Sequence, residues 1–235
     1  MNSFGNEVFA YDVKEQSPEP YISFSLTPWS GVDVTFICVP EWAVYEAVRL
    51  LVHVKEVGLL VIKSTVSLGT TDNLMKQFNV HICHNPEFLR EKHSKDDVVN
   101  PDRVIVGRCC EEHGALLLEL YAPLKKPMFV TTPLASELAK LVSNAYLATL
   151  ITFWNEVNEI TQRLKLDVQG TSHLVCSDSR MSRYGTEKFG EPFGGKCLLK
   201  DLNHLIDAYK SNGLNPTLFE AVESFNEKLG LKMKA

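Results

Sequence analysis

The sequence predicts an α/β domain over residues 1–125, followed by an α-helical domain over residues 126–235. In the first part, short apolar runs alternate with segments of helical periodicity, which indicates strands joined by crossover helices. Several of these runs are almost continuously apolar, as in a parallel sheet that is covered on both faces. After about residue 125 the pattern becomes helical, and one long segment from Pro133 to Leu164 marks the change.

Six segments are expected to form strands because they are short, apolar and rich in β-branched or aromatic residues. They are residues 7–13, 21–26, 33–39, 59–65, 79–84 and 103–107. Between them, residues 41–57 carry apolar side chains at helical spacing, and residues 67–78 can begin a helix at Thr70 or Thr71. This alternation is the reason for the α/β assignment.

The second part is expected to consist of helices and one loop. A long helix over about residues 134–163 is indicated by apolar or small side chains that recur every three or four positions. Further helices are expected after Cys197, ending at Gly213, and over residues 216–229. The stretch 176–196 is rich in serine, glycine and charge, and it is expected to be a loop that leads into the helix after Cys197.

Composition excludes several classes of function. Hydrophobic residues make up 45% of the chain and charged residues 23%, as in ordinary soluble globular proteins. The net charge of −5, without a long basic run, argues against nucleic acid or an anionic membrane surface as a partner. No apolar run is long enough to cross a bilayer, and the N-terminus shows no secretory signal. We therefore expect a cytoplasmic protein.

The cysteines point to no disulfide framework and no metal site. Six of them are spaced irregularly, at positions 38, 83, 109, 110, 176 and 197, and in the cytoplasm they are expected to be reduced. No Cys-x-x-Cys pair occurs. His81 and His84 beside Cys83 form the only group in the sequence that resembles metal ligands, and structural zinc usually needs four well-spaced ligands. We therefore expect no bound metal.

The stretch PFGGKCLLKD, residues 192–201, raises the question of what Cys197 does. Gly194 and Gly195 permit a tight turn or the close approach of another molecule. A helix that begins near Cys197 places the thiol at the positive end of the helix dipole, which stabilises a thiolate. Asp201 lies four residues later on the same helical face. The pattern suits an activated nucleophile with an acid/base neighbour, and it suits a small buried side chain equally well.

Two further groups of residues suit chemistry, although each also has a simpler explanation. Lys140 and Asn144 are four residues apart on one face of the long helix, where a solvated surface is the commoner reason for such a pair. An Asn-Pro turn places Glu87 just after one predicted strand, and Thr65 follows another. Ligands of open α/β sheets bind at the carboxyl ends of strands, but polar residues there are also common in plain loops.

Five ordered segments resemble motifs of the UDP-glucose/GDP-mannose dehydrogenase family, the NAD-dependent oxidases of nucleotide sugars. FICVP resembles the family's strand FICVGTP, and KSTVSLGTT resembles STVPPGTT. HNPEFLRE with VNPDRVIVG resembles NPEFLREG followed by NPDRIVVG. SELAKLVSNAYLATLITFWNEV resembles the helix ExxKLxxNAFLAxKISFxNE, and PFGGKCLLKD resembles the catalytic loop GYGGxCLPKD. The matches extend over nearly the whole chain and keep the family's order.

The resemblance implies a fold and a reaction. It implies a reduced Rossmann-like NAD-binding domain over residues 1–125, without the first strand and glycine loop, and a central helical domain of the dimerisation type over residues 126–235. The family oxidises the primary alcohol of a nucleotide sugar, such as UDP-glucose, to a carboxylate by two hydride transfers to NAD. The implied partners are therefore a nucleotide-sugar substrate and the cofactor NAD.

The same resemblance implies catalytic roles. Cys197 is the nucleophile that traps the intermediate aldehyde as a thiohemiacetal, and the second hydride transfer leaves a thioester. Asp201 and Lys140 handle protons and stabilise the oxyanion, with help from Asn144 and from a water near Thr65. A reactive thiol, a cation for the oxyanion and a carboxylate for protons are what this reaction requires.

Cofactor-binding positions also follow from the resemblance. Asp12 matches the acidic residue that binds the adenosine ribose of NAD. Val39, Thr65 and Glu87 belong to motif segments at strand ends and are the other expected NAD contacts. Glu87 is expected in addition to help hydrolyse the thioester.

The chain departs from the family pattern in ways that leave two hypotheses open. It resembles the family truncated at both ends: a GxGxxG phosphate loop and the C-terminal domain have no counterpart, and LLKD stands for LPKD. Because the phosphate loop cradles the pyrophosphate, we expect the isolated chain to bind NAD weakly. One hypothesis is a minimal dehydrogenase, active alone or with another chain, and it is the one we favour. The other is a degenerate paralogue that serves as a binding or structural subunit of a larger assembly.

The long helix is expected to mediate homo-oligomerisation, at least as a dimer. Leu147, Leu150, Phe153 and Trp154 add more apolar surface than one buried stripe needs. Exposed apolar surface of this kind is a liability on a monomer, so pairing of two copies is expected.

Overall fold

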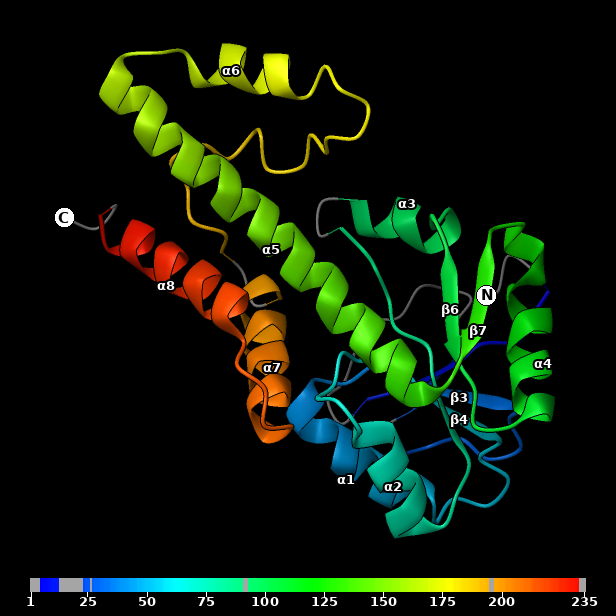
Figure 1. The fold of residues 1–235 in the computed structure, drawn as a ribbon. Coiled ribbons are helices and arrows are strands. Elements are labelled where there is room, and N and C mark those ends of the chain that lie inside the picture. The colour runs from blue at the N-terminus through cyan, green and yellow to red at the C-terminus, as the bar shows by residue number, and fades with distance from the viewer. Residues whose placement is uncertain (1–4, 13–22, 26, 91–92, 195–196, 233–235) are drawn as a thin grey trace. The chain divides into compact units, whose positions relative to one another are not determined.

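The structure is a computed structural model, and it describes residues 5–12, 23–25, 27–90, 93–194 and 197–232 (Figure 1). The chain divides into two compact units, Met1–Glu137 and Leu138–Ala235. Each unit is built around its own buried apolar side chains.

The first unit contains a five-stranded sheet with the order β3-β4-β5-β6-β7. Its strands are β3 (Val34–Ile37), β4 (Leu59–Ile62), β5 (Ile82–His84), β6 (Val104–Gly107) and β7 (Met128–Thr131). Neighbouring strands are parallel except for β5 and β6, which pair antiparallel through His84 and Gly107. The predicted α/β class is confirmed, and the antiparallel pair is the feature that the sequence did not reveal.

Helices cover the two faces of this sheet and make two separate apolar clusters. α1 (Glu41–Leu51) and α2 (Thr70–Phe78) contribute to one cluster, and α4 (Glu111–Tyr121) with a short 3-10 helix (Ala122–Leu124) contributes to the other. A further helix, α3 (Ser94–Val99), lies between β5 and β6 in the chain. Alternate side chains of β4 point to opposite faces: Leu60 and Ile62 pack in the cluster with α1 and α2, whereas Leu59 and Val61 pack in the cluster with α4. A strand buried on both faces must be apolar throughout, which explains the sequence LLVI.

A second, two-stranded parallel sheet is formed by β1 (Phe9–Tyr11) and β2 (Ser23–Ser25). Trp29 fixes this sheet, because its indole N–H donates to the Ala10 carbonyl at 3.1 Å and its ring lies 4.7 Å from that of Phe9. β1 begins later than the predicted strand 7–13, and β2 lies within the predicted strand 21–26. The ends of both predictions lie partly outside the described residues.

Strand β7 and helix α4 were missed by the sequence analysis, and residues 128–131 were wrongly placed in the helical part. β7 lies at the edge of the sheet, and its Phe129 and Val130 side chains are exposed. An edge strand with exposed apolar side chains lacks the alternating or continuous pattern by which strands are recognised. Its place is fixed by four residue pairs with β6.

The second unit contains helices and no strand among its described residues, as expected. The elements are the long α5 (Pro133–Leu164), which begins in the first unit, followed by α6 (Val168–Val175), α7 (Leu198–Ser211) and α8 (Thr217–Lys232). Gly213, with φ of +71°, follows the end of α7 as expected. Among the helices that the structure describes, none has both the length and the apolar character needed to cross a bilayer.

The core of the second unit is the contact of α5 with α7 and α8. The buried side chains share helical spacing on each element and are Leu141, Ala145, Ala148, Ile151, Leu202, Leu205, Ile206 and Val222. Two alanines in the α5 stripe allow close packing of the facing helix. Trp154 is also buried, at 2% exposure, which corrects its expected place on an exposed apolar surface.

Glu137, at 1% exposure, holds the beginning of α2. Its carboxylate accepts hydrogen bonds from the backbone N–H of Gly69 at 2.6 Å, from that of Thr71 at 2.8 Å and from the Thr71 hydroxyl at 2.6 Å. The residue at the cap position of α2 is Gly69, which has no side chain to accept hydrogen bonds from the first N–H groups of the helix. Burial raises the pKa of the Glu137 carboxyl, and the hydrogen bonds from Thr71 and Gly69 oppose this effect.

We expect Glu137→Gln to reduce the free energy of unfolding by about 1–3 kcal/mol, because its amide nitrogen replaces an oxygen that accepts from buried N–H groups. Chemical denaturation followed by circular dichroism measures the change. Glu156→Gln, an exposed position on the same helix, is the control and should have the stability of the wild type. Equal stability of both variants would contradict the capping role.

Candidate functional site

The carboxyl ends of three neighbouring strands lie at one edge of the five-stranded sheet. β3, β4 and β5 are parallel, and their last residues pair in register, Ile37 with Ile62 and Ile62 with His84. Val39, Thr65 and Glu87 follow these strand ends within a few residues. The structure thus places three of the residues expected to contact a cofactor after adjacent strands, where open α/β sheets bind ligands.

Hydrogen bonds fix the loops at this edge. The Ser64 hydroxyl donates to the Val39 carbonyl at 2.5 Å, which joins the loops after β3 and β4. The Lys63 ammonium donates to the Asn85 side-chain oxygen at 2.9 Å, which joins the loops after β4 and β5. Asn85 is buried and also accepts from the Tyr121 hydroxyl at 2.5 Å. The sequence indicated only a turn at Asn85, whereas the structure makes it the centre of this network.

The segment that carries Glu87 is held by an ion pair. The Glu87 carboxylate accepts from the backbone N–H of Leu89 at 2.6 Å. The Arg90 guanidinium then donates to the Asp97 carboxylate at 2.5 Å, and the Arg90 backbone N–H donates to the same group at 2.7 Å. These bonds lower the pKa of Asp97 to about 2. Arg90 is thereby tied to α3 shortly after Glu87.

Asp12, the expected ribose-binding residue, directly follows β1. It is half-buried and lies at the carboxyl end of that strand. β1 belongs to the two-stranded sheet, which is separate from the five-stranded sheet in strand pairing. Its position after a parallel strand is the one that the resemblance implies.

In the second unit, Cys197 is exposed and immediately precedes α7. Its carbonyl accepts the backbone N–H of Asp201 at 2.9 Å, which closes the first turn of the helix. The expected helix start is therefore confirmed. An exposed thiol at this position lies at a helix N-terminus, the end of a helix where the dipole is positive.

Asp201 and Asn144 are in direct contact. The Asn144 side-chain N–H donates to Asp201 Oδ2 at 2.5 Å, and Asp201 is only 1% exposed. The second oxygen, Oδ1, is buried and accepts no hydrogen bond from the described residues, with the Lys200 ammonium 3.5 Å away. A buried acceptor without a hydrogen bond costs about 1–3 kcal/mol, and the ion pair with Lys200 offsets part of this cost.

Lys140 lies one turn before Asn144 on α5 and is 5% exposed. The alternative of a solvated helix surface is therefore wrong for this residue. Lysine is almost never fully buried unless it is paired, so its burial in the same helix as Asn144 indicates a specific role for the ammonium group.

Two buried asparagines position the loop that leads to Cys197, and the sequence analysis missed both. The Asn155 side chain accepts from the Gly190 N–H at 2.6 Å and donates to the Glu191 carbonyl at 2.7 Å. Asn226 accepts from the Phe193 N–H at 2.8 Å and donates to the Phe193 carbonyl at 3.1 Å. A backbone that runs outside regular structure needs such partners. The motif residue pair Asn-Glu at 155–156 was the one available signal.

Both parts of the chain match models of one known protein family. Residues 25–125 match the model of the UDP-glucose/GDP-mannose dehydrogenase family, NAD binding domain. Residues 134–228 match the model of the central domain of the same family. The chain belongs to the UDP-glucose/GDP-mannose dehydrogenase family.

Individual relatives support the family assignment. The UDP-glucose 6-dehydrogenase of Rickettsia prowazekii is 38% identical over 197 residues, covering 74% of this chain and 45% of that protein. The putative UDP-glucose 6-dehydrogenase YtcA of Bacillus subtilis is 30% identical, covering 98% of this chain and 56% of that protein. The chain thus spans about half the length of these curated relatives.

A solved structure of a UDP-glucose dehydrogenase from the hyperthermophilic archaeon Pyrobaculum islandicum superposes with a TM-score of 0.88 at 29% identity. The superposition covers 96% of this chain and 63% of the Pyrobaculum islandicum chain. The Rossmann-like interpretation of the first unit is therefore confirmed.

NAD is the cofactor of the first unit, as the match to the family's NAD binding domain shows. The loops after β3, β4 and β5 offer groups that suit the ribose and amide parts of this cofactor, and the contacts of Val39, Thr65 and Glu87 with it stay predictions. The register of β3, β4 and β5 presents the backbone at Val39, the hydroxyl of Thr65 and the carboxylate of Glu87 after adjacent parallel strands. Hydroxyl, carboxylate and backbone groups are the partners that ribose hydroxyls and amides need.

We expect Asp97→Asn to lower the melting temperature at neutral pH, because the ion pair that ties Arg90 to α3 is lost. The pKa of Asp97, about 2, is below the value of about 3.9 for an unfolded chain. A depressed native pKa gives stability that is present above the unfolded pKa and is lost as pH falls through the native one. The difference between wild type and variant should therefore shrink as pH falls from about 4 towards 2.

Thermal melts from neutral pH down to the lowest pH at which the wild type is folded test this expectation. Asp96→Asn, an exposed neighbour in α3, is the matched control and should show no such acid-dependent difference. An Asp97→Asn difference that stays constant down to pH 2 would argue against the ion pair.

Proposed function

We propose that this chain supplies the NAD-binding and catalytic units of a nucleotide-sugar dehydrogenase that oxidises UDP-glucose, or a related nucleotide sugar, to the uronate. The observation that carries the proposal is in the second unit. There the exposed Cys197 begins a helix, and the buried Asp201 one turn later keeps one carboxylate oxygen without a hydrogen bond from the described residues.

Cys197 suits the role of covalent nucleophile. Its thiol is accessible, and the N-terminus of α7 favours negative charge on the sulfur or on an oxygen of a group bound to it. Attack of the sulfur on an aldehyde carbon gives a thiohemiacetal. Loss of a hydride and a proton from this adduct gives a thioester, which water hydrolyses to the carboxylate and the free thiol.

Asp201 and its partners suit proton transfer. The hydrogen bond from Asn144 holds Oδ2, so Oδ1 is left to accept a proton from the alcohol or from water. Buried Lys140 supplies positive charge on the same helix as Asn144, and such charge in a low-dielectric site stabilises an oxyanion strongly. The roles of Thr65 and Glu87 that the resemblance implies stay predictions.

NAD, when bound, supplies the oxidising power by accepting a hydride in each of two oxidations. The overall reaction consumes one alcohol, two NAD and one water. It yields one carboxylate, two NADH and three protons. Both oxidations take place at the same carbon, which is why one nucleophile that holds the aldehyde is sufficient.

The alternative is an inactive paralogue that serves as a structural subunit. The replacement of the family's proline by Leu199 is the departure nearest the nucleophile. Leu199 lies in the first turn of α7 and packs against the core cluster of the second unit. Leu199 is accommodated in the apolar packing, and Asp201 and Asn144 keep their contact. We therefore favour an active dehydrogenase over an inactive paralogue.

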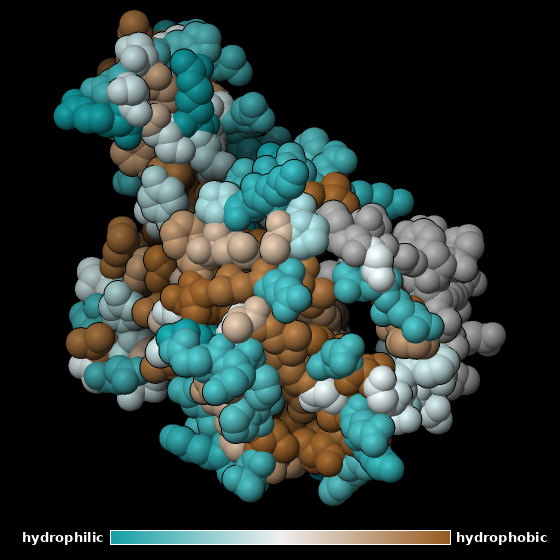
Figure 2. Space-filling model, turned by 90° about the vertical axis from the view of Figure 1, so that its right-hand side faces the viewer, coloured by the Kyte–Doolittle hydropathy of each residue, from teal (hydrophilic) through white to brown (hydrophobic). Residues whose placement is uncertain are grey.

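We also propose that α5 mediates a homodimer. Large apolar side chains are exposed on the surface of the protein (Figure 2). Four of them, Val142, Tyr146, Phe153 and Ile160, recur along α5 at intervals of four and seven residues and are 44%, 56%, 51% and 53% exposed. This spacing puts them in one stripe, as on a helix that packs against a partner helix. A symmetric pair of copies would bury the stripe.

The test of the function is NAD reduction with UDP-glucose, followed by absorbance of NADH. We expect the wild-type protein to form two NADH per uronate, and Cys197→Ala to form no uronate. Cys176→Ser, which changes another cysteine of the second unit, should keep the activity. Binding of NAD and UDP-glucose by calorimetry without turnover would instead support the inactive paralogue.

The test of the dimer is light scattering coupled to gel filtration. We expect the wild type to have the mass of a dimer, and Phe153→Lys to shift it towards the monomer because a charge in the centre of an apolar contact is costly. Leu174→Lys is the control, since Leu174 is 79% exposed on α6 and outside the stripe. A wild type that stays monomeric at high concentration would refute the dimer.

A further inference from the structure

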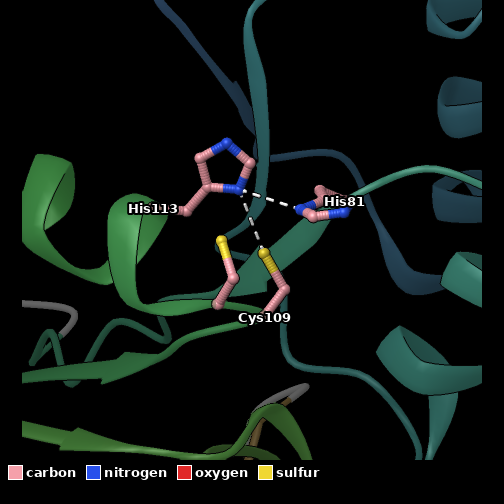
Figure 3. Close-up of side chains that lie close together, drawn as sticks. His81, Cys109 and His113 are labelled. Atoms are coloured by element: carbon pink, nitrogen blue, oxygen red, sulfur yellow. Dashed lines mark hydrogen bonds between the residues drawn. The ribbon is translucent and has the colours of Figure 1, made fainter.

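Four residues with metal-binding side chains come together in the first unit. They are His81, Cys109, Cys110 and His113, and one ligand atom from each lies within 4.8 Å of all the others. The two histidine Nδ1 atoms are 3.3 Å apart, and Cys109 Sγ is 3.2 Å from His113 Nδ1 (Figure 3). None of the four belongs to the residues proposed above for catalysis or NAD binding.

The strand pairing explains how the group forms. His84 of β5 pairs antiparallel with Gly107 of β6. Continuing this register places residues 109 and 110, which follow β6, opposite residues 82 and 81. Cys110 is the cap residue of α4, so His113 lies in the first turn of that helix. Two elements meet at the group, and the antiparallel pair of the sheet is the cause.

The distances match those of a tetrahedral zinc site. Zinc lies about 2.0–2.1 Å from histidine nitrogen and about 2.3 Å from cysteine sulfur, so tetrahedral geometry sets nitrogen–nitrogen edges of about 3.4 Å and nitrogen–sulfur edges of about 3.6 Å. The observed distances of 3.3 Å and 3.2 Å lie within a few tenths of an ångström of these edges. All four ligand atoms lie within 4.8 Å of one another, and the longest edge of the tetrahedron, between two sulfurs, is about 3.8 Å. Side-chain movements of about 1 Å are therefore enough to reach the tetrahedral distances.

We propose that His81, Cys109, Cys110 and His113 bind one Zn²⁺ ion. Two thiolates balance the charge of the ion, and two neutral imidazoles complete the closed four-coordinate set that structural zinc sites have. This donor set of two sulfurs and two nitrogens selects zinc over magnesium or calcium, which prefer oxygen. His81 is exposed and the other three ligands are half-buried, so the ion has a path to the site.

The sequence-based expectation of no metal considered a different group. His84, which was considered beside His81 and Cys83, is buried, and its Nδ1 lies 2.9 Å from the Ser136 hydroxyl. Only His81 of that group takes part in the cluster. The remaining ligands come from a segment some thirty positions later in the chain, and only strand pairing brings it near.

A disulfide is the competing use of these cysteines. Cys83 is completely buried, and its sulfur is 3.6 Å from that of Cys109. A bond between them would require an oxidant and would remove Cys109 from the metal site. The second cysteine, Cys110, and the two facing imidazoles have no part in such a disulfide, whereas a zinc ion uses all of them. The zinc site is therefore the fuller explanation of the cluster.

The consequence of zinc binding is structural. The ion would join the residue that precedes β5 to the first turn of α4, two points that the chain connects through β5, α3 and β6. A ligand that binds the folded state alone stabilises it in proportion to its concentration over its dissociation constant. The site therefore serves the first unit independently of the proposed reaction.

The test is a Co²⁺ titration of the full chain, kept reduced with a phosphine and freed of metal with a chelator. We expect visible bands of tetrahedral cobalt and a near-ultraviolet thiolate charge-transfer band, both saturating at one Co²⁺ per chain. Zn²⁺ should displace Co²⁺, abolish these bands and raise the melting temperature. Absence of the charge-transfer band, or saturation at no definite stoichiometry, would overturn the proposal.

Variants assign the ligands. His81→Ala removes an exposed side chain, so the fold should persist, and Cys110→Ser is the second variant. Each should weaken Co²⁺ and Zn²⁺ binding at least about tenfold, since loss of even an outer contact of a metal site costs this much. His53→Ala and Cys176→Ser are the matched controls and should bind as the wild type does. Wild-type affinity in both His81→Ala and Cys110→Ser would refute the site.

The disulfide is tested on the same preparation before reduction. Alkylation followed by mass spectrometry of peptides shows whether Cys83 and Cys109 are joined. Free Cys109 in protein purified without added reductant, together with bound zinc in elemental analysis, supports the proposal. A Cys83–Cys109 disulfide with no bound zinc would overturn it.

Discussion

The edge of the sheet in the first unit depends on contacts made by the beginning of α5. The Glu137 carboxylate caps α2, and the neighbouring Ser136 hydroxyl contacts His84 at the end of β5 at 2.9 Å. Gly107 makes this approach possible, because a Cβ atom there would lie 2.8 Å from the Pro133 Cα and the Ser136 Cβ. The loops that carry Thr65 and Glu87 are therefore placed by one helix start that contacts the elements next to both.

Buried polar groups are concentrated where the family's chemistry is expected. In the second unit, the side chains of Asn155 and Asn226 each donate to and accept from the loop backbone at residues 190–193, whereas Asp201 keeps one buried oxygen without a hydrogen bond from the described residues. The first arrangement gives rigidity, since every buried group is paired. The second costs stability and is expected only where a substrate or water completes the set. The contrast agrees with the roles proposed above, positioning for Asn155 and Asn226 and contact with the substrate for Asp201.

Cys110 and Cys197 share one local setting, and different roles are proposed for them. Each is the cap residue of a helix, α4 and α7 respectively. Cys197 is exposed, and its helix carries Asp201 one turn later, which suits covalent catalysis. Cys110 lies instead beside Cys109 and two imidazoles, which suits a metal ion. Both cysteines stand at a helix start, and the side chains beside each one decide which role suits it.

The sequence by itself determined the α/β class, the long helix from Pro133, the helix start at Cys197 and the family, because periodicity and motifs are local along the chain. Only the tertiary structure decided the rest. It buried Trp154 and Lys140, placed the exposed segment 128–131 at a sheet edge, and brought His81 to Cys109 through an antiparallel pair. Contacts between distant segments depend on which strand pairs with which, and a local pattern does not encode that choice.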